Sequence, residues 1–267
     1  MNAIAHRDVI HWDGKATQTV QHDLIGEEPL SIRIQGQPYS VVMRTPGDEL
    51  AHAAGFCLGE GIIDCHEDYT SLAFCDGSDT NVVTVALTSS RREKILPTLE
   101  RRSYISQTSC GLCGKELVED LYQIIHPLTD SPALDIRKVL NCLENLSQLQ
   151  PLRQQTMAAH AAAIYSRDFE LLGVGEDVGR HNALDKAIGK VFLDRKLDRV
   201  ALLILSSRIS YELVQKAARA RIPIIVAVSR PTGLAVDLAA ELNMTLASWA
   251  KDAGLFIFCG AHRLRDN

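Results

Sequence analysis

The sequence lacks an apolar stretch long enough to cross a membrane. Its longest apolar run, IPIIVAV at residues 222–228, is far shorter than the ~20 residues that a membrane-spanning helix needs. The residues MNAIAHRDVIHWDGKA at the start also lack the apolar centre of an export signal. We therefore expect a cytoplasmic protein that has no membrane partner.

The sequence also has no excess of positive charge. Lys and Arg number 28 against 33 Asp and Glu, and the resulting net charge of −5 argues against a nucleic-acid-binding protein. Neither a Walker motif nor a GxGxxG fingerprint is present. The 7 cysteines do not suggest a disulfide framework, because cytoplasmic thiols stay reduced. One close pair stands out, and the scattered remainder is predicted to pack in the interior: Cys57, Cys65, Cys75, Cys142 and Cys259.

The first half of the chain has the pattern of a small α+β domain, which we place at residues 1–130. Extended segments are expected at 30–35 and 38–44 around a hairpin turn at Gly36-Gln37. Asp48 is expected to cap a helix that ends near Gly59. Two short strands follow at 71–75 and 82–87, and then a locally basic segment at 91–102.

The second half, residues 131–267, alternates helices with buried strands. Residues 126–135 contain two prolines and several turn formers, which indicates a linker. The predicted order after it is helix 136–149, hairpin 160–174, helix 182–195, strand 200–205, helix 211–220, strand 224–228, helix 233–242 and two closing strands. Because 46% of the residues are hydrophobic, a packed core is expected. The alternation predicts a three-layer α/β domain.

The close cysteine pair is Cys110-Gly111-Leu112-Cys113-Gly114, which leads into an amphipathic helical pattern. A helix N-terminus favours the thiolate form of a nearby cysteine. Three interpretations of the pair are open: half of a zinc site, a thioredoxin-type redox motif, or a sulfur relay. No second pair of zinc ligands at suitable spacing is evident, so we predict no protein-bound metal.

Three strand-to-helix junctions each carry an arginine among small polar residues. They are Gly179-Arg180-His181-Asn182, Ser206-Ser207-Arg208 and Ser229-Arg230-Pro231-Thr232. In an α/β sheet such junctions gather at the carboxyl ends of the strands, where ligands bind. Helix N-termini and arginine forks both bind phosphate groups. The repetition predicts a large polyanionic ligand that contains pyrophosphate, although capping serines and solvated arginines explain any single junction.

Several of these segments resemble the FdhD/NarQ family of formate dehydrogenase accessory sulfurtransferases. They are EEPLSIRIQGQPYSVVMRTPGDELAHAAGFCLGEGII, SCGLCGK, GEDVGRHNALDKAIG and SSRISYELVQKAARARIPIIVAVSRPT. The resemblance runs from about Glu27 to Gly260, and it implies a cytidine-deaminase-like fold for the second domain. It also implies a sulfur carrier that receives a persulfide from a cysteine desulfurase and passes sulfur to the molybdenum bis(guanine dinucleotide) cofactor of a formate dehydrogenase. Members are expected to act as homodimers.

The resemblance assigns roles to particular residues. Cys110 is expected to carry the persulfide, with Cys113 as its partner. A cofactor-binding stretch is expected at Trp249-Ala250-Lys251-Asp252-Ala253-Gly254, where Trp249 by itself is as compatible with a core aromatic as with a stacking platform. Our further candidates for cofactor contacts are Arg180, His181, Asn182, Arg208 and Thr232. A guanine nucleotide is expected to mimic the cofactor.

The chain departs from the family pattern in two places. Its sequence also excludes one alternative function, hydrolytic deamination. Met157-Ala158-Ala159 stands before His160 where many members have Gly-Gly, and Ser207 stands where glycine is common, so the pocket is expected to be narrower. Zinc deaminases need H-x-E followed by P-C-x-x-C, whereas Ala161 and Ala162 follow His160. Deamination is therefore excluded. A cofactor chaperone and a thiol–disulfide oxidoreductase remain as alternatives.

Overall fold

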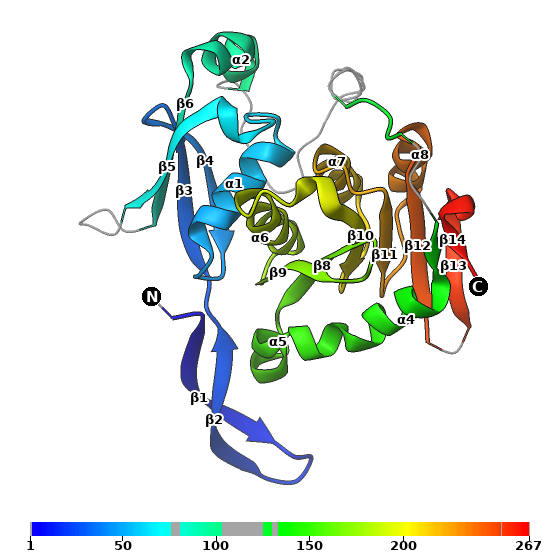
Figure 1. Cartoon of the computed structure of the whole chain (residues 1–267). Coiled ribbons are helices and arrows are strands. Elements are labelled where there is room, and N and C mark those ends of the chain that lie inside the picture. Colours follow the sequence, from blue (N-terminus) through cyan, green and yellow to red (C-terminus); the bar gives the residue numbers. More distant parts are fainter. Residues whose placement is uncertain (1, 76–80, 103–124, 130–132, 252, 267) are drawn as a thin grey trace.

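The computed structural model describes residues 2–75, 81–102, 125–129, 133–251 and 253–266. Its centre is a six-stranded sheet in the order β13-β12-β11-β10-β8-β9 (Figure 1). The strands are β8 (His160–Ser166), β9 (Leu171–Asp177), β10 (Val200–Leu205), β11 (Ile224–Ala227), β12 (Thr245–Ala250) and β13 (Gly254–Cys259). β10, β11 and β12 are parallel, and β8 is antiparallel to both β9 and β10. β13 is antiparallel to β12.

Helices cover both faces of this sheet, as the alternation of its side chains shows. Leu203 and Leu205 join one buried cluster, with α6 (Arg180–Leu193), α7 (Tyr211–Arg219) and α8 (Gly233–Glu241). Leu202 and Ile204 join a second cluster, with α4 (Ile136–Glu144). Successive side chains of a strand point to opposite faces, so the strands are buried on both. The predicted fold class is confirmed, with each predicted element within a few residues of its place.

The N-terminal part contains a second sheet in the order β4-β3-β6-β5. Its strands are β3 (Glu28–Ile34), β4 (Gln37–Arg44), β5 (Tyr69–Cys75) and β6 (Val82–Leu87), with helices α1 (Glu49–Gly59) and α2 (Ser89–Arg102) beside it. The hairpin turn lies at Gln35-Gly36, one residue earlier than predicted, because both residues have positive φ (54° and 77°) as a type I′ turn requires.

Asp48 does not cap α1 in the way the sequence predicts. Its φ is 59°, in the left-handed region, and its side chain makes no capping hydrogen bond. Its carboxylate instead lies 2.7 Å from Lys190 Nζ on α6. Asp48 therefore connects the start of α1 to another helix.

Several elements were not predicted, among them helix α2, which the sequence analysis describes only as a basic segment. A hairpin of β1 (Ile4–Trp12) and β2 (Thr17–Ile25) extends away from the body of the molecule (Figure 1). Helix α5 (Pro151–Thr156) precedes β8. A small pairing of β7 (Leu134–Asp135) with β14 (Leu264–Arg265) lies near the C-terminus. In the part of the chain that the structure describes, no helix is long and apolar enough to span a membrane.

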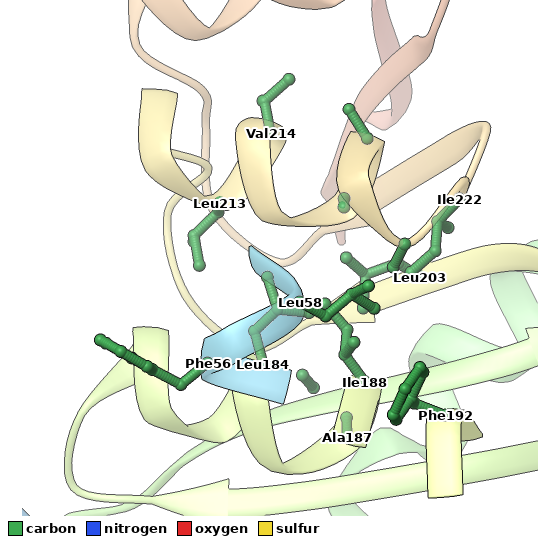
Figure 2. Close-up of a cluster of buried hydrophobic side chains, with 14 of the residues drawn as sticks. Phe56, Leu58, Leu184, Ala187, Ile188, Phe192, Leu203, Leu213, Val214 and Ile222 are labelled. Atoms are coloured by element: carbon green, nitrogen blue, oxygen red, sulfur yellow. The ribbon is translucent and has the colours of Figure 1, made fainter. Parts of the chain in front are cut away.

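The two halves of the chain share one hydrophobic core. Phe56 and Leu58 of α1 lie among Leu184 and Ile188 of α6 and Leu203 of β10 (Figure 2). The segment that we predict to be a linker also packs on this body, because the Leu128 amide donates to the Leu242 carbonyl at 2.9 Å. The division at residue 130 stays a prediction from the sequence.

Glycines let α1 and α6 come very close together. A Cβ on Gly189 would lie 1.7 Å from the Ala51 carbonyl oxygen, and one on Gly55 would lie 1.9 Å from the Asp185 carbonyl oxygen. Real Cβ atoms do not approach backbone this closely, so any side chain here would force the helices apart.

We predict that Gly189→Ala lowers the free energy of unfolding by roughly 2 kcal/mol or more, through overpacking against α1. Gly233→Ala is the matched control, because its added methyl meets open space at the start of α8. This control should be neutral or stabilising by up to ~1 kcal/mol. Urea unfolding of the three proteins measures both values, and equal midpoints would contradict the account.

Candidate functional site at the carboxyl edge of the sheet

The predicted cofactor contacts meet at one edge of the central sheet. β9 runs parallel to β10, because both are antiparallel to β8, so β9, β10, β11 and β12 all end at the same edge. Candidate residues follow each of these strands: Arg180, His181 and Asn182 after β9, Arg208 after β10, Thr232 after β11, and Trp249 and Ala250 at the end of β12. His160 opens β8 at this edge. The carboxyl edge of an α/β sheet is where such folds bind ligands.

Two basic groups at this edge have buried nitrogens without hydrogen bonds. Nε of Arg180 and Nδ1 of His160 are both inaccessible to solvent and contact no acceptor among the described residues. Burial lowers the pKa of His160, and the neighbouring charges of Arg180 and Arg153 lower it further. Buried polar groups are normally satisfied in folded proteins, so these two nitrogens are candidates for ligand contacts, although Arg33, Arg44, His52 and Gln150 also have such nitrogens. The positive surroundings favour an anion.

His181 is held between the first turns of α6 and α7. Its Nε2 lies 2.8 Å from Glu212 Oε2 and 3.3 Å from Ser210 Oγ. The hydrogen bond from His181 lowers the pKa of Glu212. The contact joins two helix N-termini, each of which carries partial positive charge. His181 therefore keeps these two N-termini together at the edge.

Asn182 already has structural partners. Its Nδ2 donates to the Met43 carbonyl at 2.7 Å and to Asp177 Oδ1 at 2.9 Å. Its side-chain amide nitrogen is thus committed to the protein. Thr232 is similar, because its Oγ1 accepts from the Ala235 amide at 3.3 Å and caps α8. Both residues stay predicted cofactor contacts.

The remaining junctions are more open. Arg208 is exposed, beside Ser206, whose Oγ accepts from the Ala161 amide at 2.8 Å. The guanidinium of Arg230 lies 5.5 Å from the centre of the Phe256 ring. Ser207 and Met157 are two of the residues for which the sequence predicts a narrower pocket. Ser207 is buried, whereas Met157 is exposed and has a φ of 56°. Glycine adopts such a φ more easily than methionine does.

The predicted stretch from Trp249 to Gly254 forms the turn between β12 and β13. Trp249 is half-buried and packs against the α4-side cluster. The amide of Ala253 donates to the Ala250 carbonyl at 2.9 Å, and Gly254 has φ of 79°. Lys251 is exposed, and Asp252 lies outside the described residues.

The cysteine pair of the sequence analysis, Cys110 and Cys113, also lies outside the described residues. Of the other five, Cys57 and Cys142 are buried as predicted and Cys259 is half-buried, but the packing prediction is wrong for the exposed Cys65 and Cys75. Burial raises the pKa of Cys57, Cys142 and Cys259, which disfavours their thiolates. Within the described ranges, no three His, Cys, Asp or Glu residues gather as a metal site.

The fold defines an α/β protein with a candidate ligand site at the carboxyl edge of its sheet, and comparison with known proteins identifies the family. The model of the FdhD/NarQ family matches residues 25–265. The sulfur carrier protein FdhD of Streptomyces coelicolor is 40% identical over 97% of this chain and 94% of that protein. That of Mycobacterium tuberculosis is 36% identical over 98% of this chain and 99% of that protein. The chain belongs to the FdhD/NarQ family.

A solved structure has the same fold. It is a crystal structure of a formate dehydrogenase accessory protein from Desulfotalea psychrophila, with a TM-score of 0.78 at 24% identity. The superposition covers 98% of this chain and 100% of that one.

A buried histidine next to the site makes stability depend on pH. Burial, and then the charges of Lys186, Lys216 and Arg44, lower the pKa of His52 well below its usual value. Below about pH 6.5 the unfolded chain takes up a proton at this residue that the folded chain does not, so stability falls as the pH falls. The loss reaches at most about 1.4 kcal/mol per pH unit.

We predict that His52→Gln reduces the loss of stability between pH 7.0 and 5.5 by about 1 kcal/mol. His22→Gln, in the exposed N-terminal hairpin, is the control and should keep the wild-type pH dependence. Urea unfolding at the two pH values measures the difference. An identical pH dependence in wild type and His52→Gln would refute this assignment.

Proposed function

We propose that this protein is a sulfur carrier that accepts a persulfide sulfur from a cysteine desulfurase on Cys110. It then delivers the sulfur to a molybdenum bis(guanine dinucleotide) cofactor, its bound substrate, before that cofactor enters a formate dehydrogenase. The proposal rests on membership of a family whose relatives are named sulfur carrier proteins. It also rests on the Cys110–Cys113 pair and on the chemistry of the carboxyl edge.

The transfer onto Cys110 needs a thiolate and an accessible loop. The Cys110 thiolate would attack the terminal sulfur of the donor's persulfide, the donor's S–S bond would break, and the donor would leave as a thiolate. A glycine follows each cysteine, Gly111 after Cys110 and Gly114 after Cys113, and a residue without a side chain permits close approach of a partner. Cys113 would assist capture or release of the sulfur.

The observation that carries the cofactor part is the pair of buried, unbonded nitrogens on Arg180 and His160. The net charge of the chain is −5, yet this edge gathers Arg153, Arg180, Arg208 and Arg230 near helix N-termini. A local positive site on an acidic protein selects anions. Two guanine dinucleotides carry two pyrophosphates, which suits several such sites along one edge.

The proposed setting is a cytoplasmic homodimer that contacts the desulfurase and the catalytic subunit of the dehydrogenase in turn. Two other functions compete with the relay. A cofactor chaperone would bind the cofactor and dock it without using either cysteine. A thiol–disulfide oxidoreductase would require both cysteines equally and would not bind guanine nucleotides.

We predict that wild-type protein incubated with a cysteine desulfurase and cysteine gains one reducible sulfur, and that Cys110→Ala gains none. Intact-protein mass spectrometry measures the gain. Cys113→Ala is the paired variant, and it shows whether the gain of sulfur also needs the second cysteine; a thiol–disulfide oxidoreductase would require both cysteines equally. If wild type gains no sulfur from an active desulfurase, the relay is wrong and the chaperone becomes the better proposal.

We predict that GDP, as a mimic of half the cofactor, binds wild type and binds Arg180→Gln about tenfold more weakly or worse, because a charged hydrogen bond is lost. Arg167→Gln is the control, because Arg167 is exposed in the turn at the opposite end of β8 and β9. Isothermal titration calorimetry measures the affinities. Equal GDP affinity of the two variants would show that Arg180 does not contact the nucleotide.

A further inference from the structure

Asp177, the last residue of β9, lies directly before the turn that carries Arg180. Its side chain is fully buried. Oδ1 accepts from the Gly179 amide and from Asn182 Nδ2, each at 2.9 Å. Oδ2 accepts from the Thr45 amide at 2.9 Å and lies 2.7 Å from Lys186 Nζ. Four donors surround one carboxylate, which explains how it remains buried.

One of these four donors, the Thr45 amide, comes from the N-terminal part of the chain, which makes further contacts with the turn. Thr45 lies in the connection between β4 and α1, and its Oγ1 accepts from the Val178 amide at 3.0 Å. The Thr45 carbonyl accepts from Lys186 Nζ at 2.7 Å. The neighbouring Met43 carbonyl accepts from Asn182 at 2.7 Å. The turn at residues 177–182 is therefore bonded to the β4–α1 connection through both backbone and side chains.

The β4–α1 connection is itself held in place by further contacts within the N-terminal part of the chain. Arg44 is fully buried, with Nη2 3.1 Å from Glu49 Oε1 and 2.6 Å from Asn81 Oδ1. The Gly47 amide donates to Glu49 Oε1 at 2.7 Å. These contacts tie Thr45 to the start of α1 and to the sheet of the N-terminal part. A shift of that part would move the turn with it.

We propose that Asp177 and Thr45 are positioning residues. Through their hydrogen bonds, the N-terminal part of the chain fixes the position of the turn that carries Arg180, so cofactor affinity depends on the N-terminal part. The proposal rests on the proposed function, because it concerns the same phosphate-binding edge. The N-terminal part also leads, through α2, into the segment that holds Cys110. In this proposal, the half of the chain whose sequence includes Cys110 also holds the turn that contacts the cofactor, which accepts the sulfur.

The coupling between the β4–α1 connection and cofactor binding has an expected size, and it acts both ways. A displacement of about 1 Å at a binding group is enough to weaken a well-oriented interaction by up to about a hundredfold. Coupling between two sites is also reciprocal, so a ligand that orders the turn should stabilise the β4–α1 connection. The contacts join residues more than a hundred positions apart in the chain, as the Thr45–Asp177 bond shows with its separation of 132.

The test uses the isosteric variant Thr45→Val, which removes the acceptor of the Val178 amide, and Thr45→Ser, which restores it. Thr245→Val is the matched control, because Thr245 is fully buried and its hydroxyl donates to the Gly260 carbonyl at 2.7 Å, at the opposite edge of the sheet. Asp177→Asn and Asp185→Asn form a second matched pair, since Asp185, on α6, is also buried and accepts a hydrogen bond from a lysine, Lys216 Nζ of α7, at 2.8 Å.

Two readouts are measured on the full-length protein: GDP affinity by calorimetry, and hydrogen–deuterium exchange of peptides covering residues 177–182 without ligand. We expect Thr45→Val and Asp177→Asn to weaken GDP binding about tenfold and to raise exchange in the turn. Thr45→Ser should recover both. Thr245→Val and Asp185→Asn should lower the melting temperature and change neither readout.

The outcomes separate the two proposals. If wild type binds no GDP, the cofactor part of the proposed function fails, and the exchange measurement still decides whether Thr45 holds the turn. If wild type binds GDP and Thr45→Val binds it equally well with unchanged exchange, the positioning role is wrong. A loss of affinity shared by Thr245→Val would show a general effect of instability and would also overturn it.

Discussion

The close packing of α1 against α6 is the contact on which the rest of the structure depends. Gly55 and Gly189 bring the two helices together, so that each backbone lies against the other. Because the contact is tight and buried, the charged groups beside it need partners. Asp177 pairs with Lys186, and Asp185 pairs with Lys216. Removing one partner would leave a buried charge, which costs several kcal/mol by order of magnitude. One interface thus joins the halves of the chain and fixes the start of α6, where the candidate site lies.

Much of the central sheet could be predicted from the sequence, because its strands are short continuous apolar runs and its helices have clear spacing. The sequence also predicted that the three junctions with an arginine meet at one edge, because parallel strands of a sheet all end at the same edge. The N-terminal hairpin could not be predicted in the same way, since its side chains are mostly exposed and show no core-facing period. The role of Asp48 was misread because a local capping pattern also suits a residue that pairs with Lys190 on another helix.

The parts of the site that sequence reasoning missed are long-range contacts. Nothing near Asp177 in the chain indicates that Thr45 will complete its carboxylate, because that contact forms only once the two halves have packed. The GEDVGRHNALDKAIG segment carries the family resemblance, and three of its residues are our predicted cofactor contacts: Arg180, His181 and Asn182. In the structure, Asp177, Asn182, Asp185 and Lys186 bond to the protein itself. Arg180, with its buried unbonded nitrogen, remains the member best placed for a ligand. A long motif can therefore encode the support of a site as much as the site.

The central claim is that this family member carries sulfur on Cys110 to a cofactor bound at the carboxyl edge. Its most direct test is complementation of a bacterium that lacks its own FdhD/NarQ protein, with formate dehydrogenase activity as the readout. The account predicts that wild type restores activity and that Cys110→Ala does not, although the variant accumulates to the same level. Restored activity with a variant lacking both Cys110 and Cys113 would contradict the sulfur relay and favour a cofactor chaperone.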